Sequence, residues 1–374
     1  MNKGFIILMT ITLCFSCHKN QTGIKLINRH SFEKVIHGQK VDLFTLKNKN
    51  GLITQITNYG GRVVNLWVPD RNGNFEDIVL GYETVEGYLH SNEIYFGALI
   101  GRYGNRIANG EFTLNDHTYT LATNNNDNHL HGGKRGFNDV VWNALQISDS
   151  ELELKYISKD GEEGYPGNLD VTVIYKLTDN DELEINYFAS TDKATPVNLT
   201  HHSFFNLHGA GKGSINDHML QINATHYTPI KKGLIPTGTI EPVKDTPFDF
   251  TKSTPIGNRV NNDDQQIKYG FGYDHNFVLD DSGLKIAAII IEPTSGRKMK
   301  VITNEPGLQF YGGNFLNGKD IGKEGLPYKH RTAFCLEAQH FPDSPNQEHF
   351  PSTILNKGEI YKSSCIYKFS IDNR

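Results

Sequence analysis

Apolar and polar residues alternate in short runs along most of the chain beyond Phe32. Residues 169–177 and 183–189, for example, alternate on either side of a polar turn, and Asn115-Asp116 separates two further short runs. A period of two residues is the pattern of a β-strand with one buried face, and Asn and Asp favour tight turns. The pattern therefore predicts a succession of strands without long helices.

The spacing of these strands also indicates how they are organised. Strands that recur at short intervals with turn residues between them are typical of a sandwich. The 374-residue chain is long enough to bury a sizeable core, and no linker-like segment divides it. We predict an all-β fold with a single domain at residues 31–374, preceded by a polar tether at residues 18–30.

Residues 1–17 have the features of a signal peptide. Lys3 gives a positive start, and the apolar run at residues 4–16 is shorter than the roughly 20 residues that a membrane-spanning helix needs. Ser16-Cys17 resembles a bacterial lipoprotein cleavage site, although Cys14 stands where Leu is usual. We expect an exported lipoprotein of the periplasm or cell envelope, lipidated at Cys17; a plain signal peptide with incidental cysteines is the alternative.

Charge and cysteine content exclude several classes of protein. The formal net charge is −5 and no basic block exists, so the electrostatic signature of a protein that binds nucleic acids or anionic membranes is absent.

Only Cys335 and Cys365 remain beyond Cys17. They are too few for a disulfide framework and lack the spacing of a zinc site. Whether they pair with each other is not determined by the sequence.

The segment 195–206 places two adjacent histidines in a strand-like run. If the segment is extended, His201 shares one face with Val197 and Leu199, and His202 shares the other face with polar side chains. His202 is therefore the better candidate for a polar site. A structural row of hydrogen-bonded side chains would explain the same pattern equally well.

Glu337 lies in the apolar run 333–339, on the face opposite Phe334 and Leu336. A carboxylate within such a strand is costly unless it is paired or functional. Glu337 is therefore a candidate catalytic group, with an ion pair to an arginine as the common alternative. His131 before two glycines is a weaker candidate, because a tight turn with an exposed histidine would look the same. Asp274, an acid just before a predicted strand, is weak by itself.

Taken together, these segments resemble the aldose 1-epimerase (galactose mutarotase) family along nearly the whole domain. The matching stretches occur in the family's order, at residues 97–108, 130–137, 160–167, 195–207, 272–277, 306–311 and 335–339. The resemblance implies a large antiparallel β-sandwich with its active site in a concave sheet face. This fold agrees with the predicted strands.

The resemblance also implies an activity. It is the interconversion of the α and β anomers of hexoses such as D-glucose and D-galactose, by acid–base opening and closure of the sugar ring. The family's base falls on Glu337 and its acid on His202, and its sugar contacts fall on Asn105, Arg106, His131, Asp274 and Gln309. This chemistry requires no cofactor, and we expect a monomer whose partner is a small sugar.

Some positions depart from the family's usual pattern, and other functions fit parts of the sequence. His201 stands where Asn is common, Phe204 where Tyr is common, and Phe341 where Trp is frequent. Asp274 and Glu337 could form the carboxylate pair of a glycoside hydrolase, or the protein could be a sugar-binding lipoprotein without catalysis. The seven matching segments favour the isomerase over both.

A structural Ca²⁺ ion is a further alternative. Residues 124–128 and 160–163 are rich in the oxygen ligands that calcium prefers. Polar surface turns are the commoner explanation of such segments.

The lipoprotein hypothesis predicts cleavage before Cys17 and attachment of the mature protein to the membrane through that residue. Mass spectrometry of the mature N-terminus should detect a lipid-modified Cys17, because the short apolar run ends at Ser16. An intact Met1, or an unmodified N-terminus at any other residue, would contradict the hypothesis.

Overall fold

The structure is a computed structural model of the chain and describes residues 23–373, so the predicted signal peptide and Cys17 lie outside the described residues. Strands dominate, and the α-helices of the described part, α1 (Val85–Leu89) and α2 (Gln265–Gly270), are short. Neighbouring strands pair in an antiparallel manner. The predicted antiparallel all-β fold is therefore confirmed. Within residues 23–373, no helix is long and apolar enough to span a membrane.

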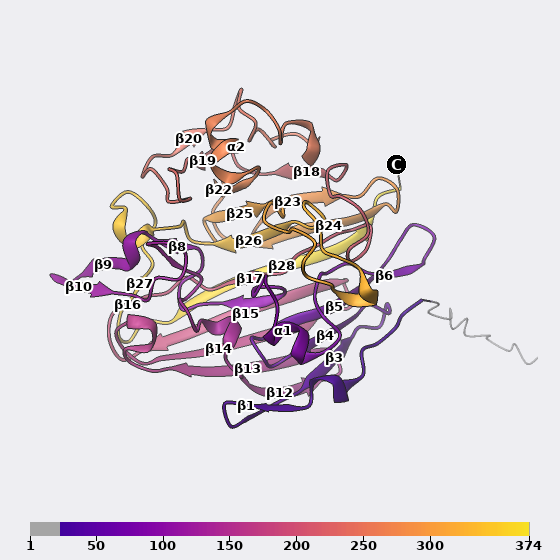
Figure 1. Ribbon diagram of the computed structural model, residues 1–374, viewed down its shortest axis with the longest axis horizontal. Helices are drawn as coiled ribbons and strands as arrows, with labels where there is room; N and C mark the ends of the chain where they lie inside the picture. Colours follow the sequence, from indigo (N-terminus) through magenta and orange to yellow (C-terminus); the bar gives the residue numbers. More distant parts are fainter. Residues whose placement is uncertain (1–22, 374) are drawn as a thin grey trace, which may run out of the picture.

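One layer of the sandwich is a nine-stranded sheet (Figure 1). In order across the sheet, its strands are β12 (Asn143–Ser148), β13 (Glu151–Ser158), β14 (Leu169–Leu177), β15 (Glu182–Thr191), β28 (Tyr361–Ile371), β24 (Arg297–Thr303), β23 (Lys285–Ile291), β18 (Met219–Ile222) and β21 (Thr254–Pro255). The alternating runs around residues 178–181 form the hairpin of β14 and β15, as predicted.

The second layer combines two smaller sheets and a strand pair between them. The five-stranded sheet contains β20 (Glu241–Pro242), β19 (His226–Thr228), β22 (Asp274–Val278), β25 (Gly307–Tyr311) and β26 (Cys335–Gln339). The four-stranded sheet contains β3 (Leu43–Lys47), β4 (Ile53–Thr57), β5 (Arg62–Pro69) and β6 (Phe75–Asp77). Between these sheets, β7 (Ala98–Ile100) pairs with β17 (Thr200–His202), and β17 lies against β26.

Four short strand pairs complete the fold. They are β1 (Lys34–Ile36) with β2 (Gln39–Val41), β8 (Arg106–Ile107) with β11 (His129–Leu130), β9 (Glu111–Leu114) with β10 (His117–Thr120), and β16 (Thr195–Pro196) with β27 (Ile354–Leu355). The turn between β9 and β10 is the predicted Asn115-Asp116 turn, and both residues have positive φ, as a two-residue hairpin loop of this type requires.

The main hydrophobic core is shared by the two layers. Tyr175 and Ile185 from the nine-stranded sheet, and Phe310 and Leu336 from the five-stranded sheet, are almost fully buried in the same cluster. Strands of the second layer therefore bury one face in this core and leave the other face for the functional site. Cys335 and Cys365 are buried as free thiols, which answers the question of their pairing.

Residues 23–30, the described part of the predicted tether, lie against the domain. The backbone N–H of Ile27 donates to the side-chain oxygen of Gln55 at 2.8 Å, and the Gln55 amide donates back to the Ile27 carbonyl at 3.0 Å. Arg29 forms an ion pair with Asp42. This part of the segment is thus attached to β4 of the four-stranded sheet and to Asp42, the residue directly before β3.

The shared core predicts a contrast between two neighbouring positions of the nine-stranded sheet. Ile185 is fully buried, so Ile185→Ala should lower the free energy of unfolding by about 2–5 kcal/mol. Tyr175 is the cross-strand partner of Ile185, and Lys176 follows it and is exposed. Lys176→Ala should therefore change the free energy of unfolding by less than about 0.5 kcal/mol. Urea denaturation followed by circular dichroism measures both; equal losses would show that Ile185 does not belong to a tightly packed core.

Candidate functional site

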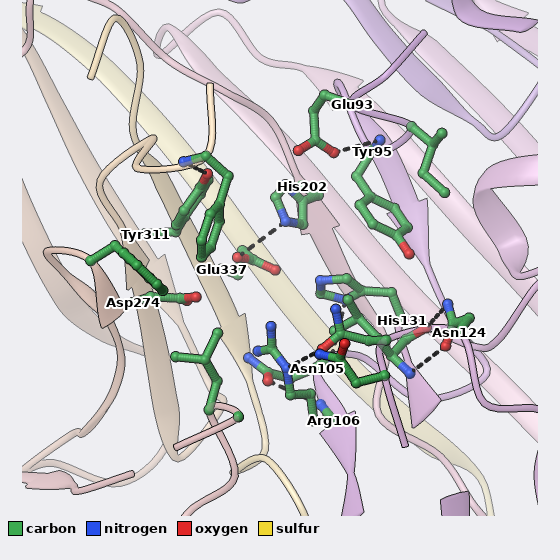
Figure 2. Close-up of a pocket in the computed structure, with 18 of the residues that line it drawn as sticks. Glu93, Tyr95, Asn105, Arg106, Asn124, His131, His202, Asp274, Tyr311 and Glu337 are labelled. Carbon is green, nitrogen blue, oxygen red and sulfur yellow. Dashed lines mark hydrogen bonds and ion pairs between the residues drawn. The ribbon is translucent and has the colours of Figure 1, made fainter. Parts of the chain in front are cut away.

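A cavity of about 880 Å³ opens on the outer face of the second layer. Its walls come from strands β8, β17, β22, β25 and β26 and from the segments that connect them. Figure 2 shows the polar side chains of these walls converging on a common space. The cavity is lined by residues that include Glu93, Tyr95, Asn105, Arg106, Asn125, His131, His202, Leu234, Phe271, Asp274, Tyr311, Phe315 and Glu337.

His202 and Glu337 form the centre of the cavity. The Nε2 atom of His202 lies 3.6 Å from the Oε1 atom of Glu337, and both side chains are buried. The second carboxylate oxygen of Glu337 is buried without a hydrogen-bond partner among the described residues. A buried carboxylate with an unused acceptor is costly. The arrangement therefore suits a ligand hydroxyl that donates to Glu337.

The adjacent histidine faces the opposite side of β17. The ring of His201 packs 5.9 Å from the Tyr175 ring and 6.2 Å from the Tyr367 ring, in the core between the two layers. His201 is 1% exposed, and neither of its ring nitrogens has a hydrogen-bond partner in residues 23–373. His202 instead lines the cavity. The strand alternation thus separates the two histidines as the sequence predicts.

His131 enters the cavity from a tight turn after β11. The backbone N–H of Asn105 donates to Nδ1 of His131 at 3.1 Å, so the proton of the neutral ring lies on Nε2. The neighbouring Gly132 has φ +89°, and a Cβ atom there would lie 1.8 Å from the Gly101 carbonyl oxygen. Only glycine fits this contact, which explains why the histidine precedes glycine in the sequence.

Arg106 lines the cavity, and its positive charge lowers the pKa of Glu337. Its Nε donates to the side-chain oxygen of Asn125 at 3.1 Å, and no carboxylate of the described chain forms an ion pair with it. Arg106 therefore offers its terminal N–H groups to the cavity. Asn105 lies beside it with φ +64°, and its side-chain oxygen accepts the backbone N–H of Arg106 at 2.9 Å.

Asp274 faces the cavity from β22, whereas Gln309 lies behind it on β25. The Gln309 amide donates to Oδ1 of Asp274 at 2.6 Å. Burial raises the pKa of Asp274, while the charge of Arg106 and the bond from Gln309 lower it. Gln309 itself does not line the cavity in this structure. Of the seven predicted site residues, the structure thus brings six to the cavity wall and places Gln309 where it orients Asp274.

Several residues that line the cavity were not among the site residues predicted from the sequence, among them Glu93, Tyr95 and Tyr311. The Tyr95 ring stacks on His202 with ring centroids 5.7 Å apart and contacts His131 edge-on at 4.7 Å. Tyr95 lies two residues before the matching stretch 97–108, and Tyr311 is the last residue of the stretch 306–311. These positions were the available signal. Glu93 gave no signal of its own.

The cavity also contains three groups that could ligate a metal. His131, His202 and Glu337 offer ligand atoms within 4.8 Å of one another, and two histidines with a glutamate are a familiar zinc ligand set. The same three side chains line the cavity and would contact any ligand bound there. A transition-metal ion at this position would therefore compete with that ligand.

The segments considered for Ca²⁺ have other partners. The Asn124 amide donates to two backbone carbonyls at 2.9 Å. Asp160 forms an ion pair with Lys193 at 2.7 Å, Glu162 accepts from the Tyr156 hydroxyl at 2.6 Å, and Glu163 accepts backbone N–H groups. Calcium binding at residues 160–163 would require these carboxylates to exchange their present partners for the ion.

The chain is similar to known proteins over most of its length. The family model described as aldose 1-epimerase matches residues 42–368, which include all seven predicted site residues. The galactose mutarotase of Bos taurus is 45% identical over 332 residues, covering 88% of this chain and 94% of that protein. The aldose 1-epimerase of Escherichia coli (strain K12) is 38% identical over 337 residues, covering 89% of this chain and 96% of that protein.

Solved structures show the same architecture. An aldose epimerase homologue from C. elegans superimposes with a TM-score of 0.82 at 27% sequence identity, covering 89% of this chain and 100% of that one. A galactose 1-epimerase from Lactobacillus acidophilus gives a TM-score of 0.79 at 28% identity, covering 91% of this chain and 97% of that one. The two-layer fold is therefore shared with these proteins.

Proposed function

Because the chain belongs to the aldose 1-epimerase family, we propose that it interconverts the α and β anomers of hexoses such as D-glucose and D-galactose. The protein is an isomerase and acts on a small sugar. The observation that carries this function is the contact between a buried carboxylate and a buried imidazole at 3.6 Å, inside a cavity lined with hydrogen-bonding groups. Polarimetry of freshly dissolved sugars, with and without the protein, tests it directly.

The pair supplies both proton transfers that the reaction needs. Ionised Glu337 takes the proton of the anomeric hydroxyl, and protonated His202 gives a proton to the ring oxygen. The ring opens to the aldehyde, rotation about the C1–C2 bond exposes its other face, and the same groups act in reverse. Each proton returns to its donor, so one acid and one base suffice.

The other polar residues of the cavity hold the sugar. Arg106 presents the terminal N–H groups of a guanidinium that forms no ion pair within residues 23–373, and Asp274 presents a carboxylate oriented by Gln309. Charged groups make the stronger hydrogen bonds to hydroxyls, and fixed groups position the ring for reaction. His131 can donate from Nε2, and Asn105 fixes that ring. Asp274 thus serves as a binding group, rather than as the second carboxylate of a hydrolase.

The resting state of the acid–base pair differs from its reactive state. Burial lowers the pKa of His202 to about 3 and raises the pKa of Glu337 well above its usual value. Both shifts favour the neutral forms, so the pair holds one proton over a wide pH range. Transfer of this proton from Glu337 to His202 creates the reactive ion pair, which mutual attraction stabilises.

These pKa shifts predict a broad, bell-shaped pH profile of kcat/KM. As the pH falls, a second proton binds to the His202–Glu337 pair and Glu337 can no longer act as a base. The lowered pKa of His202 places this limb well below the ordinary histidine range. As the pH rises, the last proton leaves and His202 can no longer act as an acid; the raised pKa of Glu337 moves this limb upward. Polarimetric rates, corrected for spontaneous mutarotation at each pH, measure the profile, and a flat profile would contradict the assignment.

The two adjacent histidines give a matched pair of variants. His202→Ala should lower kcat about 10³-fold, which corresponds to about 4 kcal/mol of transition-state stabilisation. Glu337→Gln should be similarly damaging, because it removes the base and keeps the shape. His201→Ala should retain most activity while losing stability, because His201 packs in the core.

Polarimetry on purified variants, with folding checked by circular dichroism, measures this contrast. A folded His202→Ala protein with the parent's rate would show that the acid is another residue. An inactive but folded His201→Ala protein would reverse the facing assigned to β17.

We also infer that the protein is exported, attached to the envelope through a lipid on Cys17, and monomeric. The support for export and attachment is the character of residues 1–17. A tethered enzyme at the envelope would meet sugars as they enter the cell. Its cavity is formed by one chain, so a monomer is sufficient for activity.

A further inference from the structure

One acidic side chain of the cavity has no role in the proposed mechanism. Glu93 lies between α1 and β7 and lines the same cavity as His202 and Glu337. One of its carboxylate oxygens accepts the backbone N–H of Tyr95 at 3.1 Å. Within residues 23–373, no cation forms an ion pair with Glu93 and its other oxygen has no hydrogen-bond partner. A partly buried carboxylate left in this state suits a ligand that donates to it.

The backbone on both sides of Glu93 is firmly held. Asp320 accepts the backbone N–H and the side-chain amide of Asn92 at 2.9 and 3.1 Å. On the other side, the buried Arg62 donates to the carbonyl of Ile94 at 2.9 Å. The carboxylate of Glu93 is therefore presented to the cavity from a fixed position, as a specific contact with a ligand requires.

The acid–base pair determines which part of a sugar would meet Glu93. Figure 2 shows Asp274 and Arg106 on one side of the His202–Glu337 pair and Glu93 on the other. In the proposed mechanism O1 faces Glu337 and the ring oxygen faces His202. From C1, one direction around the ring leads to C2 and C3, and the other leads through the ring oxygen to C5. Asp274 and Arg106 therefore face the hydroxyls at C2 and C3, and Glu93 faces the substituent at C5.

We propose that Glu93 is a specificity-determining residue that accepts a hydrogen bond from the C6 hydroxyl of the hexose. The inference rests on the proposed function, because the roles of His202 and Glu337 orient the ring. A pentose lacks this hydroxyl and leaves the carboxylate unpaired, which is the situation in which a polar site discriminates strongly. A uronic acid has a carboxylate at C6 and is repelled by Glu93.

The test uses three sugars that share their configuration from C2 to C4. D-Galactose has a hydroxyl at C6, L-arabinose lacks C6, and D-galacturonate has a carboxylate there. Burial raises the pKa of Glu93 to about 7, so the assays are run above that pH, where the carboxylate is ionised. Polarimetry on the full chain gives kcat/KM for each sugar. The wild-type protein should prefer D-galactose to both others.

Glu93→Ala should reduce kcat/KM for D-galactose by about 10- to 100-fold, as expected for the loss of a hydrogen bond to a charged group. The value for L-arabinose should change by less than about threefold, because that sugar never makes the bond. The preference for the hexose should therefore nearly disappear. A merely structural role for Glu93 would lower both values by the same factor, and that outcome would overturn the proposal.

Glu93→Gln separates the hydrogen bond from the charge. The amide can still bond to the C6 hydroxyl, so most of the preference for D-galactose over L-arabinose should return. D-Galacturonate should gain about tenfold relative to D-galactose, because the repulsion is gone. No gain for the uronate in this variant, together with an unchanged preference in Glu93→Ala, would exclude Glu93 from the C6 position.

Glu111→Ala is the matched control, since Glu111 is an exposed carboxylate that does not line the cavity. Its three kcat/KM values should equal those of the wild-type protein.

The outcomes also separate this inference from the function on which it rests. Activity on D-galactose with an unaltered sugar preference in Glu93→Ala rejects the inference alone. The absence of catalysis on every aldose in the wild-type protein rejects the proposed function and this inference with it.

Discussion

The active site depends on the two-residue period of β17 and β26, the strands that separate the core from the cavity. Each strand buries one face among the apolar side chains of the core, as at His201 and Leu336, and turns the other face outward, as at His202 and Glu337. A slip by one residue would exchange the two faces. The hydrophobic core therefore fixes the register, and the register brings His202 and Glu337, the proposed acid and base, within 3.6 Å of each other.

The burial of Glu337 beside His202 has an electrostatic cost, which the rest of the fold must offset. Burial, the charge of Asp274 and then that of Glu93 raise the pKa of Glu337, and Arg106 opposes them. The second oxygen of Glu337 and the side-chain oxygen of Gln309 both lack partners among the described residues. Large paired sheets can tolerate a few such groups, because the core is extensive. Gln309 lies behind the cavity wall, so it is Glu337 that is prepared for a ligand hydroxyl, because its second oxygen has no partner without one.

The sequence predicted those features that depend on local pattern. Alternation located the hairpin of β14 and β15 and assigned His202, rather than His201, to the polar side. The position of Gln309 behind Asp274 could not be found in this way, because it follows from the pairing of β22 with β25, whose strands are distant in sequence. Glu93 was missed for a similar reason, because an irregular segment carries it. That segment is held at the cavity by contacts with residues distant in sequence, such as Arg62 and Asp320.

The positions that depart from the family's usual pattern show which properties the site can vary. Phe204 stacks on His202 with ring centroids 4.9 Å apart and adds an apolar surface without a hydroxyl, so it favours the neutral imidazole, in the same direction as burial. His201 lies in the core, and Phe341 packs against Phe350 without lining the cavity. None of the three departures places a new charge beside the acid–base pair. They change the surroundings of His202 and Glu337 without removing either group of the proposed proton transfer. Glu93, in contrast, places a carboxylate in the cavity wall, where the proposal assigns it a part in the choice of sugar.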